Sequence, residues 1–158
     1  MKQKLFCFGD EFTIQDDAGR DAFFVDGKVF SVGNKLSFQD MSGNEQAFIQ
    51  QKLLSWTPTY EIYRNGELAA VVKKEAFTFF HTKFTIDIQG SDPFVVDGDI
   101  LNHNYVFTCD GREIAQVSKQ WFAISDSYGV DVADGRDDVL MLACTVVIDM
   151  VCHGDKKH

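Results

Sequence analysis

The segment that most constrains the fold is the apolar run over residues 139–152, which follows the pair Asp137-Asp138. Aspartates at this place suit the start of a helix, because they cap free backbone N–H groups and interact favourably with the helix dipole. The run is apolar on nearly every side, which is typical of a helix buried all round. Its 14 residues are too few to cross a bilayer, which takes about 20. A buried strand over residues 145–148 is the alternative, but length and the acidic cap favour a helix over 137–152.

The rest of the chain has the composition of a β protein. Val, Ile, Phe, Tyr, Trp and Thr together number 53 of 158 residues, against 22 for Ala, Leu and Met, so an all-helical bundle is excluded. No Pro-rich or Ser-rich linker divides the chain, which predicts one domain over residues 1–153 and a polar tail over 154–158. Asp26-Gly27, between two apolar runs, is a strong hairpin signal.

A hairpin pattern recurs three times around the turn glycines Gly43, Gly66 and Gly111. Four residues after each glycine stands an alanine, and six after it a β-branched residue, which predicts that both lie on one face of the returning strand. These pairs are Ala47 and Ile49, Ala70 and Val72, and Ala115 and Val117. Lysines follow at or just beyond the eighth residue.

A longer duplication relates the two halves of the chain. Phe12-Thr13-Ile14 recurs as Phe84-Thr85-Ile86, and Asp26-Gly27 recurs as Asp97-Gly98 at nearly the same spacing. Two similar halves in one all-β unit suggest a barrel or sandwich with internal pseudo-symmetry.

Charge and cysteines exclude several classes of function. The net charge of −9 repels phosphate backbones, so we expect no nucleic-acid partner. The four cysteines form no C-x-x-C pair, and no secretory signal precedes the first strand, so we expect reduced thiols in a cytoplasmic protein. The sequence has no catalytic serine, phosphate-loop or dinucleotide motif and points to no cofactor.

At this point the chain resembles the LURP-one-related family of the tubby C-terminal-like superfamily. The order and spacing of several short motifs over about residues 1–153 carry the resemblance. They are Lys4-Leu5-Phe6, Phe12-Thr13-Ile14, Val25-Asp26-Gly27-Lys28, Phe30-Ser31, Lys35-Leu36, Ile49-Gln50-Gln51-Lys52-Leu53-Leu54-Ser55, Tyr60-Glu61-Ile62, Ala115-Gln116-Val117-Ser118-Lys119-Gln120-Trp121-Phe122, Asp126-Ser127-Tyr128-Gly129-Val130 and the terminal run with Ile148-Asp149.

The resemblance implies a mainly β fold, a closed antiparallel barrel of about twelve strands around a central hydrophobic C-terminal helix. Such a lumen would account for a helix without a polar face, and closure would remove the sheet edges. Asp126, Tyr128, Gly129 and Ile148-Asp149 are also similar to the pattern of phospholipid scramblases. Because the terminal run is short, we expect neither a transmembrane segment nor lipid scrambling.

The resemblance also suggests a lipid headgroup as partner, because tubby domains hold phosphoinositides with basic residues on neighbouring strands. The candidate residues here are Lys52, Lys73, Lys74, Lys119 and Arg112, which stand near the ends of the recurring hairpins. Solvated strand ends that discourage edge pairing are the alternative interpretation.

The acidic segment 126–138 is the candidate metal site, with Asp126, Asp131 and Asp134 as speculative calcium ligands. Its spacing does not match an EF-hand loop, and helix capping with a solvated turn is the alternative. Asp149 is the one formal charge in the apolar run, so it needs hydrogen bonds or a partner on the barrel wall. Two hypotheses follow: a non-enzymatic binding or scaffold domain for a phospholipid headgroup or a protein, and an enzyme with a metal-assisted site in segment 126–138.

Overall fold

The computed structural model describes residues 2–8, 11–29, 34–75, 82–119 and 127–153. Within these ranges, twelve strands precede one long helix. The strands are β1 (Lys2–Phe8), β2 (Glu11–Gln15), β3 (Asp21–Val29), β4 (Asn34–Asp40), β5 (Glu45–Gln51), β6 (Thr59–Arg64), β7 (Glu67–Lys74), β8 (Phe84–Ile88), β9 (Phe94–Asp99), β10 (Asn104–Cys109), β11 (Arg112–Ser118) and β12 (Ser127–Val132). A short 3-10 helix, η1 (Ile100–Asn102), joins β9 to β10, and the chain continues into α1 (Asp138–His153). The predicted mainly β class with one C-terminal helix is confirmed.

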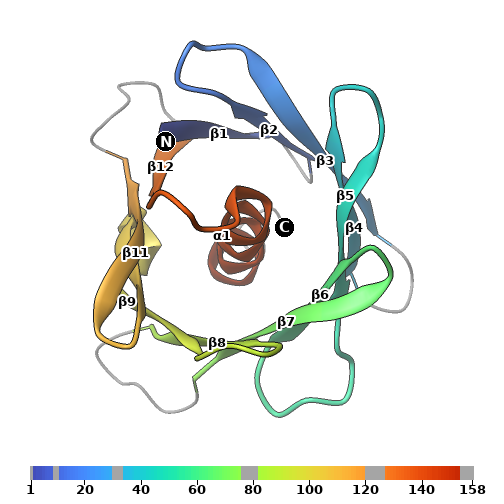
Figure 1. Cartoon of the computed structure of the whole chain (residues 1–158). Coiled ribbons are helices and arrows are strands. Elements are labelled where there is room, and N and C mark those ends of the chain that lie inside the picture. The colour runs from blue at the N-terminus through green and yellow to red at the C-terminus, as the bar shows by residue number, and fades with distance from the viewer. Residues whose placement is uncertain (1, 9–10, 30–33, 76–81, 120–126, 154–158) are drawn as a thin grey trace.

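Each strand pairs antiparallel with the next in sequence, and β1 also pairs with β12. The last ladder runs from Lys2 opposite Asp131 to Phe6 opposite Ser127. The strand order is therefore that of a closed barrel, and α1 lies inside it (Figure 1). A ring without free edges leaves every strand with a partner on both sides.

The inner faces of the strands and the whole middle of α1 form a single core. Ala47 and Ile49, Ala70 and Val72, and Ala115 and Val117 are all buried, which confirms the predicted inward face of the three returning strands. Four phenylalanines from four different strands are also fully buried, namely Phe12, Phe38, Phe84 and Phe107. Each such side chain contributes about 1.5–3 kcal/mol relative to exposure. On α1, all residues from Met141 to Ile148 are buried in this core.

The start of α1 is fixed by Asp137, as the sequence predicts for this acidic pair. Its Oδ1 accepts a hydrogen bond from the Leu140 backbone N–H at 3.2 Å, which makes it the N-cap. Its Oδ2 accepts another from Arg64 Nη1 at 2.6 Å, at the end of β6. The helix thus begins one residue later than predicted, and the alternative of a strand over 145–148 is wrong.

Burial raises the pKa of the Cys144 thiol in the middle of α1, so this sulfur stays protonated.

The sequence duplication corresponds to a spacing of six strands in the ring. Phe12 and Ile14 point inward from β2, and Phe84 and Ile86 point inward from β8. Asp26-Gly27 lies in β3 and Asp97-Gly98 in β9. Because β2 and β8, like β3 and β9, are six places apart in a ring of twelve, the two halves of the sequence form opposite halves of the barrel.

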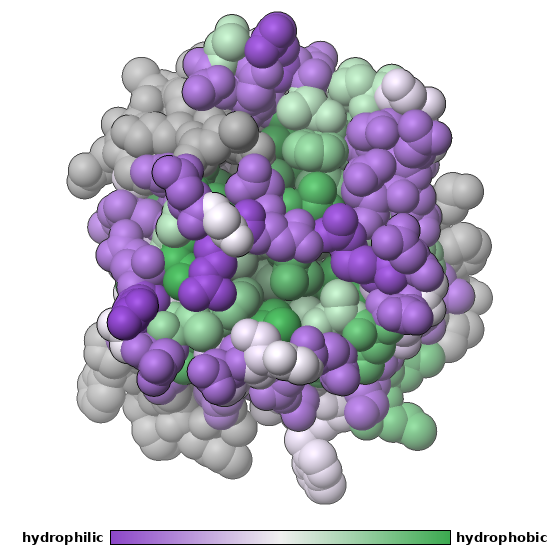
Figure 2. Space-filling model, viewed as in Figure 1, coloured by the Kyte–Doolittle hydropathy of each residue, from purple (hydrophilic) through white to green (hydrophobic). Residues whose placement is uncertain are grey.

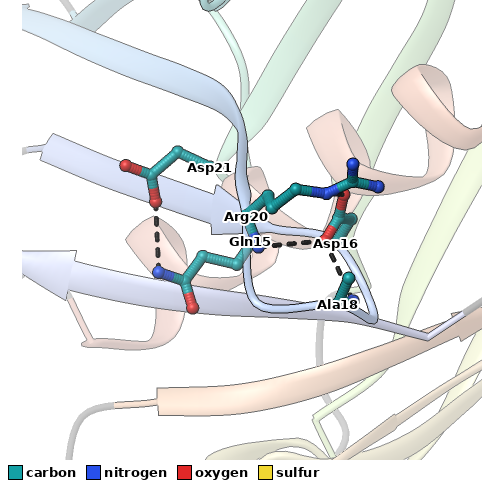
Figure 3. Close-up of polar contacts among 5 residues, drawn as sticks. All are labelled: Gln15, Asp16, Ala18, Arg20 and Asp21. Carbon is teal, nitrogen blue, oxygen red and sulfur yellow. Dashed lines mark hydrogen bonds and ion pairs between the residues drawn. The ribbon is translucent and has the colours of Figure 1, made fainter.

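Two hairpin turns share one hydrogen-bonding design, shown for Asp16 in Figure 3. Asp16 Oδ1 accepts from the backbone N–H groups of Ala18 and Arg20 at 2.9 and 3.0 Å, and Asp40 does the same for Ser42 and Asn44. The bond from the Arg20 N–H is the main cause that holds the pKa of Asp16 below its usual value. This carboxylate therefore supports the turn at neutral pH, and that support disappears as the pH falls through its lowered pKa.

The hairpin predicted at Asp26-Gly27 is wrong. Both residues continue through β3, opposite Ser37 and Leu36 of β4, and the homologous Asp97-Gly98 continues through β9. The turn signal is local, whereas the ladder to β4 continues through both residues to Val29 and holds them extended.

Gly98 has a packing reason to be glycine. Its φ is +130°, and a Cβ built there would lie 2.8 Å from both the Asn104 carbonyl oxygen and the Tyr105 Cα on β10. We expect Gly98→Ala to lower the free energy of unfolding by roughly 2–3 kcal/mol, measured by urea denaturation. Gly90→Ala is the matched control, because Gly90 also has a positive φ but open space around it. Equal losses at the two positions would show that the close approach of β9 to β10 is unimportant.

Candidate functional site

The barrel has two chemically different ends. The turns between β2 and β3, β4 and β5, β6 and β7, β8 and β9, and β10 and β11 lie at the end where α1 begins, here the α1 N-terminal end. The connections between β5 and β6, β7 and β8, and β9 and β10 lie where α1 finishes, here the α1 C-terminal end. Figure 2 shows the molecule from the same side as Figure 1. Hydrophilic residues dominate the outer part of this face, and hydrophobic residues gather toward the middle of the barrel, where Figure 1 places α1.

Three of the five predicted basic residues come together at the α1 C-terminal end. Lys52 follows β5, and its backbone N–H donates to the Thr59 carbonyl at 2.8 Å. Lys74 ends β7, and its backbone N–H donates to the neighbouring Pro58 carbonyl at 3.1 Å. Lys73 pairs in register with Thr59. The backbones of the three lysines, here the basic cluster, therefore adjoin the start of β6, with Lys73 on the outer face of β7 and Lys74 on its inner face.

The other two predicted basic residues lie elsewhere. Lys119 follows β11 at the same end of the barrel, four strands from β7 around the ring. Arg112 begins β11 beside the turn at the α1 N-terminal end. The sequence spacing correctly placed all five residues near strand ends. Arg112 lies at the start of its strand and therefore at the opposite end of the barrel, whereas Lys119 lies at the same end as the other lysines but four strands away around the ring.

The charges within the basic cluster differ in their surroundings. Lys73 Nζ lies 3.6 Å from Asp87 Oδ2 on β8, with both side chains about half exposed. Among the residues that the structure describes, no carboxylate forms an ion pair with Lys52 or Lys74. Lys74 stands on the inward-facing side of β7 and is close enough to Cys152 for its charge to oppose the burial-raised pKa of that thiol.

The connection between β5 and β6 carries exposed apolar side chains that the sequence reasoning missed. Leu54 is 95% exposed and Trp56 is 104% exposed, and Leu53 is more than half exposed. We name residues 53–56 the apolar loop; it begins directly after Lys52. The signal available in the sequence was Leu53-Leu54-Ser55-Trp56 lying between two strand patterns, where turns usually have polar residues.

Asp149 lies one turn from the end of α1 and is only 7% exposed. Its Oδ1 is 3.8 Å from His103 Nδ1, on the connection after η1. The His103 ring stacks on Tyr128 of β12, with centroids 4.4 Å apart and planes 14° apart. His103 is thus one partner of the buried Asp149, and it lies on the connection between β9 and β10, not on a strand of the barrel wall. Burial, reinforced by the charge of Asp149, raises the pKa of Tyr105 well above its usual value.

We expect the interaction between Asp149 and His103 to stabilise the folded protein. Asp149→Asn or His103→Gln should each lower the free energy of unfolding by about 1–3 kcal/mol, because each leaves a buried polar group poorly bonded. The double variant should cost less than the sum of the two, with a coupling of about 0.5–3 kcal/mol. Urea denaturation of the four proteins measures this. Strict additivity would mean that the two side chains act independently.

The acidic segment does not assemble the predicted calcium ligands. Asp131 lies on β12 between the buried Val130 and Val132, so it faces outward, whereas Asp134 is exposed in the turn before α1. Asp126 lies outside the described residues. Within the described parts of the chain, no group of three His, Cys, Asp or Glu side chains is placed to hold a metal ion.

Acidic residues are abundant at the α1 N-terminal end. Its turns carry Asp16, Asp17, Asp40, Asp92, Asp110, Asp134 and Asp137. The basic cluster lies at the opposite end, so the net charge of −9 is not spread evenly over the barrel. An anionic surface approaching the α1 C-terminal end would meet Lys52 and Lys74 well away from these aspartates.

The fold and these ends define a class of protein: a β-barrel domain that encloses its own C-terminal helix. The model of the LURP-one-related family matches residues 1–149, and the chain belongs to this family, which confirms the resemblance. The chain is 37% identical over 157 residues to the uncharacterized protein YxjI of Bacillus subtilis (strain 168), covering 99% of this chain and 94% of that protein.

A solved structure shares the fold. An X-ray structure of a protein from Arabidopsis thaliana superposes with a TM-score of 0.74 at 20% identity, covering 95% of this chain and 90% of that one. At this identity the likeness concerns the fold alone. In the described part of the chain, neither α1 nor η1 is long enough to qualify as a membrane-spanning helix.

Proposed function

We propose that this protein is a non-enzymatic binding domain of the cytoplasm that acts as a closed barrel and recognises the headgroups of anionic phospholipids. The observation that carries the proposal is the basic cluster, in which Lys52, Lys73 and Lys74 flank the start of β6. Membership of the chain in the LURP-one-related family supports the same proposal, because this family resembles the tubby C-terminal-like superfamily, which includes phosphoinositide binders.

The energies favour weak, salt-sensitive binding. A lysine close to an anionic membrane contributes about 1 kcal/mol, and the attraction fades within a Debye length of about 10 Å at 0.1 M salt. Lys73 contributes less than the other two, because Asp87 already lies near its ammonium group. The aspartates of the α1 N-terminal end stand on the far side of the barrel, where screening limits their repulsion.

Co-sedimentation with vesicles tests this function. The protein should bind phosphatidylcholine vesicles that contain phosphatidylserine or a phosphoinositide at low salt, and lose most of that binding at moderate salt. Lys52→Gln with Lys74→Gln should weaken binding about tenfold or more, given two lysines at about 1 kcal/mol each. Arg112→Gln is the matched control, since it removes a cation from the other end of the barrel.

Absence of binding at low salt would refute the lipid function and leave a scaffold for a protein partner as the remaining binding function. The enzyme hypothesis has its own measurement. Calcium that raised the melting temperature of the wild type, but not of Asp131→Asn with Asp134→Asn, would favour a metal-assisted site in segment 126–138, because a ligand stabilises the state that binds it.

A further inference from the structure

The apolar loop has a shape that its own base keeps fixed. The backbone N–H groups of Lys52 and Lys74 donate to the carbonyls of Thr59 and Pro58 at 2.8 and 3.1 Å. Ser55 Oγ lies 2.8 Å from Thr59 Oγ1, and the Thr59 hydroxyl donates to the Thr57 carbonyl at 3.0 Å. Because Thr59 is itself buried, these bonds fasten both arms of the loop to the barrel and keep its tip outside.

The side chains at the tip are those that a lipid interface prefers. Leu54 and Trp56 are the two most exposed of the large hydrophobic side chains that the structure describes, and Leu53 accompanies them. An apolar cluster on the surface of a soluble domain marks a site of interaction. Tryptophan prefers the headgroup level of a bilayer, and leucine gains by entering the acyl region below it.

The surroundings of the loop favour a bilayer over another protein surface. The side chains of Leu54 and Trp56 are almost fully exposed, so they suit a soft medium that can close around them. Lys52 adjoins the tip in sequence, and Lys74 bonds the base of the loop. A basic margin around an apolar tip complements anionic headgroups around a hydrocarbon interior.

We infer that the apolar loop inserts into the interface of an anionic phospholipid bilayer, while the basic cluster at its base contacts the headgroups. The inference deepens the proposed function and rests on it for the anionic part. It adds a component that salt does not screen, namely transfer of Leu54 and Trp56 out of water. The barrel would approach the membrane by the side that carries β5 to β7, because Asp97 and Asp99 occupy the α1 C-terminal end near β9.

The test uses the full-length protein, vesicles of phosphatidylcholine with or without phosphatidylserine, and two readouts. Co-sedimentation measures binding, and quenching of tryptophan fluorescence by brominated lipid measures insertion. We expect the wild type to bind anionic vesicles with quenching. Leu54→Ser with Trp56→Ser should weaken binding about tenfold or more, because each side chain loses its transfer out of water.

Matched controls remove other exposed apolar side chains. Met41 lies in the β4–β5 turn and Leu101 in η1, and both are more than half exposed. Met41→Ser and Leu101→Ser should leave binding and quenching unchanged. Trp56→Phe should keep most of the binding and lose the quenching that depends on Trp56, which assigns the signal to the loop. Thermal melting of each variant verifies that it folds.

The outcomes separate the inference from the proposed function. If the lysine variant loses binding, the wild type shows no quenching and the Leu54/Trp56 variant binds anionic vesicles like wild type, insertion is overturned and headgroup recognition stands. If the wild type binds neutral and anionic vesicles equally, with quenching, insertion stands and headgroup recognition fails. Absence of binding to both vesicles overturns both.

Discussion

Ala143→Asp should unfold this protein. Ala143 lies in the middle of α1 and is fully buried in the hydrophobic core, and α1 lies inside the barrel (Figure 1). A carboxylate placed there has no hydrogen-bonding partner within its reach and loses its hydration, so the free energy of unfolding should fall by about 5 kcal/mol or more. That loss is comparable with the whole stability of an ordinary domain.

Circular dichroism and thermal melting provide the measurement. Ala143→Asp should lack a cooperative transition and accumulate in the insoluble fraction. Ala133→Asp is the matched control, because Ala133 is exposed after β12 and the same charge there should change stability by at most about 0.5 kcal/mol. Wild-type solubility and melting temperature for Ala143→Asp would mean that α1 does not occupy the lumen.

Removal of β1 should have an effect of similar size through the backbone. Deletion of residues 1–8 removes two hydrogen-bonded ladders, to β2 and to β12, and leaves both of these strands with a free edge. It also opens one side of the lumen around α1. Because unpaired edges promote association with other chains, we expect a protein that aggregates and has lost its cooperative melting transition.

Size-exclusion chromatography and thermal melting distinguish the outcomes. Deletion of residues 154–158 is the control, since these residues follow α1 and lie beyond the family match, which ends at residue 149. That shortened chain should melt like wild type. A monomeric, cooperatively folding protein without residues 1–8 would mean that the ladder between β1 and β12 is dispensable and the sheet works open.

Patterns of local origin were the ones that the sequence revealed correctly. The period-2 burial after each turn glycine predicted the inward positions of Ala70 and Val72, and the cap at Asp137 predicted the start of the helix. Asp26-Gly27 misled for a complementary reason. Its turn propensity is worth little against the long ladder to β4, so strand pairing decided the conformation of these two residues.

The candidate site was harder to predict, because its contacts join segments that are distant in sequence. Arg64 and Asp137 are 73 residues apart, and His103 meets Asp149 only when α1 lies inside the barrel. Lys52 and Lys74 become neighbours through the start of β6. No spacing rule predicts such meetings, whereas the apolar loop consists of consecutive residues between two strands and was open to detection from the sequence.

The order of α1 after all twelve strands has a consequence for biosynthesis. The segment that fills the lumen leaves the ribosome after the strands that surround it, and β12, which completes the ring with β1, leaves just before α1. A nascent chain therefore presents strands with apolar inner faces before the helix that packs against them has been made. Such a chain is prone to aggregation until α1 emerges. We expect the barrel to fold in a concerted step after α1 has emerged, with the incomplete barrel a natural client for chaperones that hold apolar surfaces.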